Sequence, residues 1–315
     1  MIYVLSPANF ATGGTELLHQ FGRQAIDLGA EACMLYLNAS SGINPVHERF
    51  YHYDVPYSTD FGLICSDDVV VFPEIYTNLV HQTPARIKAV WWLSVGNYKP
   101  RHALRKRMID WFRGRKELDL AELGIRHYVQ SDFAREFIVT NGASFSGYLS
   151  DYLSADFING AANVDMTAKR DIIVYNPKKG MEFTKQVMAA APNFEFVPIQ
   201  GMTPAQVADL LAAAKVYIDF GSHPGKDRIP REAAIMGCCV LVGAMGSAAN
   251  AKDVPIPSRF KFAMTPFDVK SVVLTLEKCL EDFSVVSLEF DTYKQMIRHE
   301  ECDFRAQVTD FINSL

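Results

Sequence analysis

Short apolar runs alternate with amphipathic segments along the first half of the chain. The apolar runs are typical of buried strands, which we expect at residues 2–5, 33–37, 69–72, 89–93 and 128–129. Apolar residues at helical spacing predict two helices between these strands, over residues 15–28 and 132–139. Strands that alternate with helices in this way predict a parallel, doubly wound sheet.

The pattern lapses around residues 159–163, where small and polar residues gather. This lapse is the expected domain boundary. Beyond it, a helix capped by Thr203 and begun by Pro204 is predicted. We also expect strands at residues 171–175, 194–197, 216–218 and 240–242, and helices over 181–190, 268–281 and 291–312. The sequence therefore predicts an α/β fold with two Rossmann-like, doubly wound parallel-sheet domains facing a cleft, over residues 1–160 and 161–290, and a closing helix over 291–315.

Composition is that of a soluble globular protein. Hydrophobic residues make up 49% of the 315 positions and charged residues 21%. The formal net charge of −5 gives no electrostatic case for binding nucleic acid, which is not an expected partner. The six cysteines form no C-x-x-C pair, and most lie in apolar segments. They are expected to be reduced and packed, with neither a disulfide framework nor a zinc site.

Two apolar stretches bear on the cellular compartment. The first five residues run directly into Ser6 and Pro7 without a basic flank, so they predict a strand and not a signal peptide. The uncharged run 233–251 is rich in Gly, Ala, Ser and Asn, which is not typical of a membrane span. The expected location is cytoplasmic.

The segment 216–243 carries the densest candidate chemistry. An apolar run is followed by a basic loop, a short helix begun by Pro230 and stopped by Gly237, and a second apolar run. The candidate donor-binding residues of this segment are His223, Gly225, Lys226, Arg228, Arg231 and Glu232. Cations, free backbone N–H groups and a helix N-terminus at the carboxyl end of a strand favour an anionic ligand. A diphosphate is the expected ligand.

Two further turns follow predicted strands. Lys178 and Lys179 come after the strand 171–175, where their ammonium groups would screen a diphosphate, although the same sequence is also typical of an exposed turn. Gly13, Gly14 and Thr15 follow the first strand and are also candidate donor-binding residues, because the two glycines let a ligand oxygen approach the helix N-terminus closely. A tight turn with Thr15 as N-cap is the alternative for this motif.

Together these motifs resemble the glycosyltransferases of the GT-B fold, in particular their retaining branch. The matching residues are Gly13-Gly14, Lys179-Gly180 and the run Arg-Glu-Ala-Ala-Ile-Met-Gly that ends at Gly237. The resemblance spans both expected domains, and the last run is its most specific part. It implies a nucleotide-sugar site in the second domain and an acceptor site in the first. It also implies that Lys179 contacts the donor diphosphate, that Glu232 holds the ribose hydroxyls, and that Gly13-Gly14 lies beside the donor phosphate or the transferred sugar.

The chain departs from that branch at one position. The branch commonly has a second glutamate eight positions before the one matched by Glu232, and this chain has Pro224 there. The usual sugar-contacting carboxylate therefore has no counterpart, and the stereochemical outcome stays open, with retention implied by the resemblance. Lys179, Arg228 and Glu232 are the expected catalytic residues. Cations that bind the departing diphosphate more tightly as it gains charge lower the barrier, so no metal or other cofactor is required.

Three residues of the first domain are acceptor-side candidates: Glu74, Trp92 and Asn97. Glu74 follows the strand 69–72 and would be the general base of an inverting enzyme, with an ordinary loop carboxylate as the alternative. Trp92 and Asn97 would line the cleft, although a tryptophan beside a strand also suits a core.

The segment from Lys99 to Lys116 interleaves basic and apolar residues. It predicts either a solvated helix whose apolar face joins the core, or a peripheral contact with the inner face of an anionic membrane. In the second case, the acceptor would be lipid-linked or anionic.

The sequence thus predicts a glycosyltransferase that moves a sugar from a nucleotide-sugar donor to a hydroxyl acceptor, such as a glycan or a lipid-linked saccharide. A nucleotide-sugar epimerase and a non-catalytic nucleotide-binding protein are the alternatives. An NAD-dependent dehydrogenase is disfavoured because the first strand-to-helix turn lacks G-x-G-x-x-G.

Overall fold

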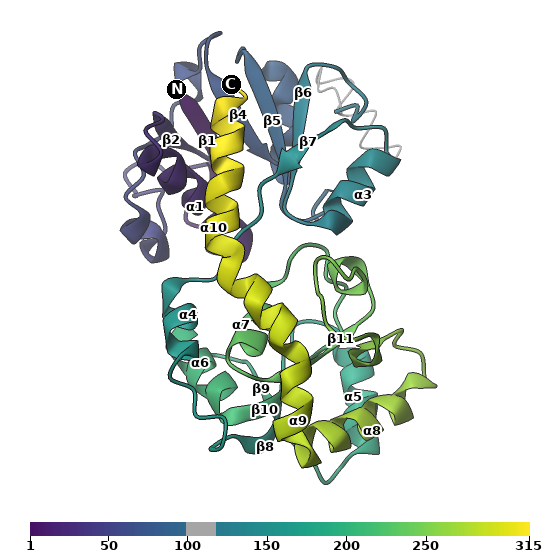
Figure 1. The fold of residues 1–315 in the computed structure, drawn as a ribbon. Coiled ribbons are helices and arrows are strands. Elements are labelled where there is room, and N and C mark those ends of the chain that lie inside the picture. The colour runs from purple at the N-terminus through teal and green to yellow at the C-terminus, as the bar shows by residue number, and fades with distance from the viewer. Residues whose placement is uncertain (99–117) are drawn as a thin grey trace. The chain divides into compact units, whose positions relative to one another are not determined.

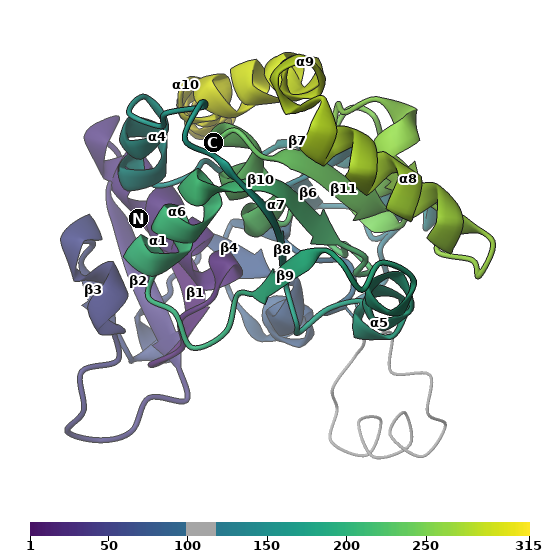
Figure 2. The same cartoon turned by 90° about the horizontal axis from the view of Figure 1, so that it is seen from below.

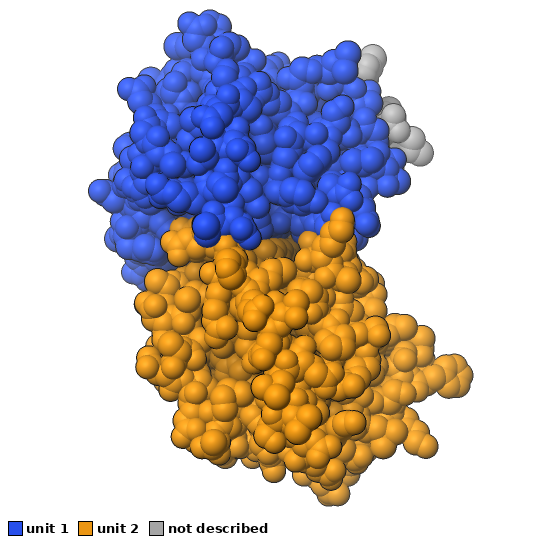
Figure 3. Space-filling model, in the orientation of Figure 1, with its two compact units in different colours: residues 1–151, 302–315 blue, residues 152–301 orange. Residues whose placement is uncertain are grey.

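Two separate parallel sheets organise the protein. The computed structural model describes residues 1–98 and 118–315, which divide into two compact units. The first unit consists of Met1–Asp151 with Cys302–Leu315, and the second of Tyr152–Glu301, as coloured in Figure 3. The first unit thus ends before the predicted boundary at residue 160, because the chain around that boundary forms helix α4 (Ala155–Ala161), whose Phe157 joins the core of the second unit.

The first unit is built on a seven-stranded sheet in the order β3-β2-β1-β4-β5-β6-β7, in which all neighbouring strands are parallel. Its elements are β1 (Ile2–Pro7), α1 (Gly13–Asp27), β2 (Ala32–Leu37), η1 (Glu48–Tyr53), β3 (Tyr57–Ser58), η2 (Phe61–Leu63), β4 (Val69–Pro73), η3 (Glu74–Gln82), β5 (Ile87–Trp92), β6 (Ile125–Val129), α3 (Asp132–Thr140) and β7 (Phe145–Tyr148). The strand order reverses between β1 and β4, and such a switch point is where open α/β sheets bind ligands.

Helices cover both faces of this sheet. Trp91 and Trp92 are consecutive in β5, so their side chains point to opposite faces. Trp91 packs against Phe21 of α1 and Phe304 of α10 (Asp291–Asn313), with ring centroids 5.7 and 6.5 Å apart. Trp92 packs against Phe137 of α3 at 5.7 Å. Figure 1 shows α1 and the last turns of α10 in front of the strands of this unit.

The second unit is built on a five-stranded sheet in the order β12-β11-β10-β8-β9, again parallel throughout. Figure 2 shows β9, β8, β10 and β11 side by side. Its remaining elements are β8 (Arg170–Tyr175), α5 (Met181–Ala190), β9 (Glu195–Pro198), α6 (Pro204–Ala213), β10 (Ala214–Asp219), α7 (Arg228–Ile235), β11 (Cys239–Gly243), η4 (Gly246–Ala249), η5 (Ser258–Phe260), β12 (Lys261–Phe262), α8 (Asp268–Glu281), α9 (Phe283–Val286) and η6 (Ser287–Phe290). Taken in chain order, the strands follow the flavodoxin-like arrangement, whose switch point lies between the first and third strands, here β8 and β10.

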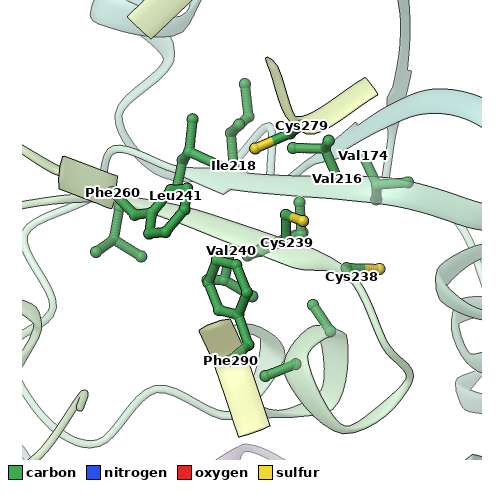
Figure 4. Close-up of a cluster of buried hydrophobic side chains, with 14 of the residues drawn as sticks. Val174, Val216, Ile218, Cys238, Cys239, Val240, Leu241, Phe260, Cys279 and Phe290 are labelled. Carbon is green, nitrogen blue, oxygen red and sulfur yellow. The ribbon is translucent and has the colours of Figure 1, made fainter. Parts of the chain in front are cut away.

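The core of the second unit surrounds β10 and β11, which are buried on both faces. Strands buried on both faces have near-continuous apolar sequences, and the runs at 216–218 and 240–242 follow this rule. Figure 4 shows Val216 and Ile218 of β10 among the labelled core side chains, together with Phe260 and Phe290. The last two rings lie 4.7 Å apart between centroids. Cys239 and Cys279 belong to the same core as free thiols, as expected from the sequence.

The predicted α/β class with two Rossmann-like parallel sheets is confirmed. The predicted helices over 181–190 and 268–281 match α5 and α8 residue for residue, and Thr203 caps α6 through a capping box with Gln206. Helix α7 begins at Arg228 and not at Pro230. The short strands β3, β7 and β12 were not predicted. Among the described residues, no helix has the length and apolar character needed to cross a membrane.

Phe290 provides a test of the second core. Its side chain is fully buried against Phe260, so Phe290→Ala leaves a cavity and should reduce the free energy of unfolding by about 3 to 5 kcal/mol. Leu288 lies two residues earlier and is 61% exposed, so Leu288→Ala should change the free energy of unfolding by less than about 0.5 kcal/mol. Urea unfolding monitored by circular dichroism measures both values, and equal effects of the two substitutions would contradict the placement of Phe290.

Candidate functional site

Two loops of the second unit meet at the switch point of its sheet. The first, residues 176–180, follows β8, and the second, residues 220–227, follows β10. Gly180 has a φ of +59°, and a Cβ placed on it would lie 2.1 Å from the carbonyl oxygen of Phe220. A Cβ on Gly221 would lie 2.8 Å from the Cβ of Lys179. The backbones therefore approach so closely that glycine is required at both positions.

This contact brings Lys179 to Asp227 of the second loop, which is in turn linked to His223 of the same loop and to Asp219 at the end of β10. The ammonium nitrogen of Lys179 lies 2.8 Å from both carboxylate oxygens of Asp227. Nδ1 of His223 lies 2.8 Å from Oδ2 of the same carboxylate, and Nε2 of His223 lies 3.1 Å from the carbonyl oxygen of Asp219. We refer to Lys179, Asp219, His223 and Asp227 as the switch-point cluster. Besides Asp219 at the end of β10, its residues come from the two segments that follow β8 and β10, in which the sequence predicted basic ligand-binding residues. The sheet topology places these two segments side by side.

The hydrogen bonds of His223 define its charge. Both ring nitrogens face oxygen atoms that can only accept a hydrogen bond, so both nitrogens carry a proton and the ring is an imidazolium. Burial by itself lowers the pKa of His223, but the hydrogen bond to Asp227 and the charges of Asp219 and Asp227 outweigh it, so the pKa is raised above its usual value. The pKa of Asp227 is lowered, because the contacts with His223 and Lys179 outweigh the effect of burial.

The cluster also has the composition of a cation site. Asp219, His223 and Asp227 each offer a ligand atom, and these atoms lie within 4.8 Å of one another. However, Lys179 already contacts both oxygens of Asp227, while the oxygens of Asp219 accept hydrogen bonds from the Tyr217 hydroxyl and the Gly221 N–H. This donor set suits neutralisation by ammonium and imidazolium groups. The expectation that no metal is required stays a prediction.

Arg231 and Lys226 support the second loop from inside the unit. The guanidinium of Arg231 is fully buried and donates to Glu300 at 2.7 Å, and also to the carbonyl oxygens of Lys226 and Asp227. The ammonium of Lys226 lies 2.8 Å from the other oxygen of Glu300. Lys226 and Arg231, both predicted to bind the donor, thus form an internal ion-pair network with Glu300 of α10. Local sequence could not reveal this network, because Glu300 is distant in the chain.

The remaining candidates of this unit surround the same loops. The loop carbonyl of Gly225 accepts a hydrogen bond from the Ser247 hydroxyl at 2.7 Å, so the loop is held on this side as well. Arg228 begins α7 and donates to the carbonyl oxygen of Tyr152, and Glu232 lies one turn further along the same helix, half-buried. Lys178 is exposed, next to Lys179.

In the first unit, the turn after β1 begins helix α1. Thr12, and not Thr15, is the N-cap: its hydroxyl accepts from the Thr15 N–H, and the Thr15 hydroxyl accepts from the Thr12 N–H. The helix therefore starts at Gly13, which makes Gly13 and Gly14 its first two residues. Their N–H groups have no intrahelical partner, as in any first helical turn.

Glu74 lies at the neighbouring strand end of the same sheet, directly after β4. It is almost fully buried and accepts hydrogen bonds from the Leu93 N–H at 3.2 Å and from the side chain of Asn97 at 3.0 Å. Burial raises the pKa of Glu74 to about 7, although these hydrogen bonds act in the opposite direction. A Cβ on Gly14 would lie 3.7 Å from the Leu93 side chain, so the turn after β1 and the residues around Glu74 lie close together.

Trp92 does not share this position. Its ring is fully buried on the α3 side of the sheet, and its indole N–H donates to His127 at 3.1 Å. The predicted pair of Glu74 and Asn97 is brought together, whereas Trp92 is a core residue. Leu93, the residue after Trp92, holds Glu74 through its backbone N–H. The basic segment from Lys99 to Lys116 lies outside the described residues.

Solved structures match both units. A sucrose-phosphate synthase from Thermosynechococcus elongatus is 12% identical with a TM-score of 0.64, and the match covers 99% of this chain and 98% of that chain. A glycosyltransferase from Rickettsia africae is 11% identical with a TM-score of 0.62, covering 99% and 96%. A structure from E. coli named trehalose-6-phosphate, bound with UDP-2-fluoro glucose, is 10% identical with a TM-score of 0.62, covering 99% and 98%.

The chain has the GT-B fold. At these identities, the matches establish the fold of the two units and not the activity. No protein-family profile and no curated protein matches the chain. Within the GT-B fold, the switch-point cluster belongs to the second Rossmann-like unit, and Glu74 with the Gly13-Gly14 turn belongs to the first.

The raised pKa of Glu74 predicts a pH dependence of stability. The folded-state pKa of about 7 lies above the ordinary value of 4.5, so the folded protein loses stability as the pH rises through this window. The total loss is about 3 kcal/mol, at about 1.4 kcal/mol for each pKa unit. The amide of Glu74→Gln cannot ionise. Between about pH 4.5 and pH 8, the free energy of unfolding of wild type should therefore fall by about 3 kcal/mol relative to that of this variant.

Urea unfolding at several pH values measures this difference. The matched control is Glu182→Gln, at an exposed position of α5, which should keep a constant offset from wild type over the same range. A constant offset for Glu74→Gln as well would mean that Glu74 titrates normally.

Proposed function

We propose that the protein is a glycosyltransferase that transfers a sugar from a nucleotide-sugar donor to a hydroxyl acceptor. The observation that carries the proposal is the switch-point cluster: it gathers an ammonium and an imidazolium between β8 and β10 of the second Rossmann-like unit. Open α/β sheets bind nucleotides at this point. The bound UDP-2-fluoro glucose named for the E. coli structure is consistent with such a donor.

The donor contacts follow from this placement. Lys179 and His223 would bind the oxygens of the donor diphosphate, with Lys178 and Arg228 at the rim of the same site. Arg228 offers a planar fork that matches two phosphate oxygens. Glu232, one turn into α7, would accept hydrogen bonds from the ribose hydroxyls. Support for these roles comes from the clustering of cations at one sheet edge and from the sequence resemblance to the retaining branch.

The chemical step breaks the bond between the anomeric carbon and the diphosphate oxygen and forms a bond from that carbon to the acceptor oxygen. The diphosphate leaves with the electron pair, and its oxygen would take up the proton that the acceptor hydroxyl loses. Because negative charge grows on the leaving group, cations fixed beside it bind the transition state more tightly than the donor. Catalysis of this kind requires no metal, and we propose the metal-independent, retaining reaction.

The acceptor side is proposed for the first unit. The buried carboxyl of Glu74 accepts a hydrogen bond from the exposed side chain of Asn97 beside the Gly13-Gly14 turn, at the switch point between β1 and β4. With a pKa of about 7, Glu74 can carry a proton near neutral pH, and in the retaining reaction it would orient an acceptor hydroxyl by hydrogen bonding, whereas deprotonation of that hydroxyl by Glu74 would belong to an inverting reaction. A glycan or a lipid-linked saccharide is the proposed acceptor class.

Donor binding can be tested by thermal shift with a panel of nucleoside diphosphates and nucleotide sugars. A ligand at about 100 times its Kd stabilises the folded state by about 2.7 kcal/mol, so one member of the panel should raise the melting temperature by a few degrees. In Lys179→Met and in Glu232→Gln, the same shift should require at least about tenfold more ligand, because each substitution removes a proposed donor contact. Lys185→Met, at an exposed site of α5, carries the same charge change as Lys179→Met and should leave the shift unchanged.

Transfer or hydrolysis of a radiolabelled sugar from the selected donor then separates the candidate functions. Binding without turnover over a broad acceptor panel would favour a non-catalytic nucleotide-binding protein, an alternative that the absence of a glutamate at Pro224 supports. The absence of any shift in folded protein would contradict a nucleotide-sugar site.

A further inference from the structure

Asp227 occupies the position expected of a ligand anion. Both of its carboxylate oxygens lie 2.8 Å from the ammonium of Lys179, and one lies 2.8 Å from Nδ1 of His223. The residue also directly precedes α7, yet its side chain makes no capping hydrogen bond to that helix. A carboxylate with these partners takes the same contacts that a phosphate oxygen would take.

We propose that the Asp227 carboxylate competes with the donor diphosphate for Lys179 and His223, and so limits the affinity of the site for anions. This inference rests on the proposed function. Donor binding then exchanges the Lys179–Asp227 ion pair for a Lys179–phosphate ion pair, and part of the binding energy is used in that exchange.

The charges of the cluster support this competition. Lys179 and His223 contribute two positive charges, and Asp219 and Asp227 two negative charges, while the Tyr217 hydroxyl is neutral and donates to Asp219. The cluster therefore has no net charge with which to attract a diphosphate. Replacing Asp227 by asparagine leaves one net positive charge.

The two acidic residues play different parts. Asp219 is held by the Tyr217 hydroxyl and the Gly221 N–H at the end of β10, so it is part of the strand-to-loop turn. The Asp227 side chain contacts the two cations, whereas the loop itself is held through its backbone carbonyl groups, which accept hydrogen bonds from Arg231 and Ser247. An amide at position 227 therefore removes the anion and leaves these loop contacts in place.

The competition between Asp227 and the ligand also makes anion affinity depend on pH. His223 loses its proton as the pH rises through its raised pKa, and within the switch-point cluster Lys179 then remains as the single cation. Anion affinity should then fall with rising pH. The hydrogen bond to Asp227 is a cause of the raised pKa, so the fall should occur at a lower pH in Asp227→Asn.

Isothermal titration of the full chain with inorganic pyrophosphate and with uridine diphosphate tests the proposal. Asp227→Asn should bind both about tenfold more tightly than wild type near neutral pH, because a like charge beside the ligand has been removed. Asp209→Asn, at an exposed position of α6, changes the net charge of the protein equally and should not alter affinity. In the double variant Lys179→Met/Asp227→Asn, the gain should be lost, since the competition is for Lys179.

The outcomes separate this inference from the proposed function. If wild type binds uridine diphosphate and Asp227→Asn binds it equally or more weakly, the competition is refuted while the donor site stands. If Asp227→Asn gains affinity for pyrophosphate but no nucleotide or nucleotide sugar is preferred or turned over, the competition of Asp227 with anions for Lys179 and His223 stands and the proposed function fails. If neither protein binds either anion, both are refuted. Circular dichroism melting of each variant, with Asp227→Ala as a second substitution, verifies that the comparisons are made on folded protein.

Discussion

The candidate donor site depends on one backbone contact, that of Gly180 with the carbonyl oxygen of Phe220. It joins the loops that follow β8 and β10 at the point where the strand order of the sheet reverses. Any side chain at position 180 would force these loops apart, and a positive φ adds a second reason for glycine. Because the loops touch here, Lys179 reaches Asp227 and His223, and three charges come together in a region that the surrounding apolar core partly shields from water. The chemistry of the site is therefore a consequence of how closely two turns can approach.

The first unit uses the same topological position with different chemistry. At the switch point between β1 and β4 there is no cluster of cations among the described residues, but a buried carboxyl group, Glu74, held by a backbone N–H and by Asn97. Burial raises the pKa of Glu74, whereas Asp227, beside Lys179 and His223, has a lowered pKa. One fold thus holds two carboxyl groups in opposite electrostatic environments: one is suited to proton transfer and the other to binding cations.

Much of the fold was predictable because the central strands are uninterrupted apolar runs and the helices carry capping residues such as Thr203. The strands β3, β7 and β12 were not predictable, since they have two to four residues and are largely not buried. The site was predictable as a location, because both basic segments follow parallel strands. The partners of the basic residues were not, because the acid that pairs with Arg231 is Glu300, 69 residues further along the chain. A basic residue in a loop does not reveal whether its charge faces a ligand or an internal acid.

The acidic residues of the β10 loop also bear on the departure from the retaining branch. Pro224 replaces the glutamate that would contact the sugar, and Asp227, three positions later, contacts Lys179 instead. An acid at position 224 would add a negative charge beside the switch-point cluster, whose two cations, Lys179 and His223, are already matched by Asp219 and Asp227. The loop therefore has a carboxylate directed at the proposed phosphate contacts and none at the position that the branch uses for the sugar. In the proposed glycosyltransferase, recognition of the sugar would then come from other groups, and Asp227 would set the charge of the proposed diphosphate site.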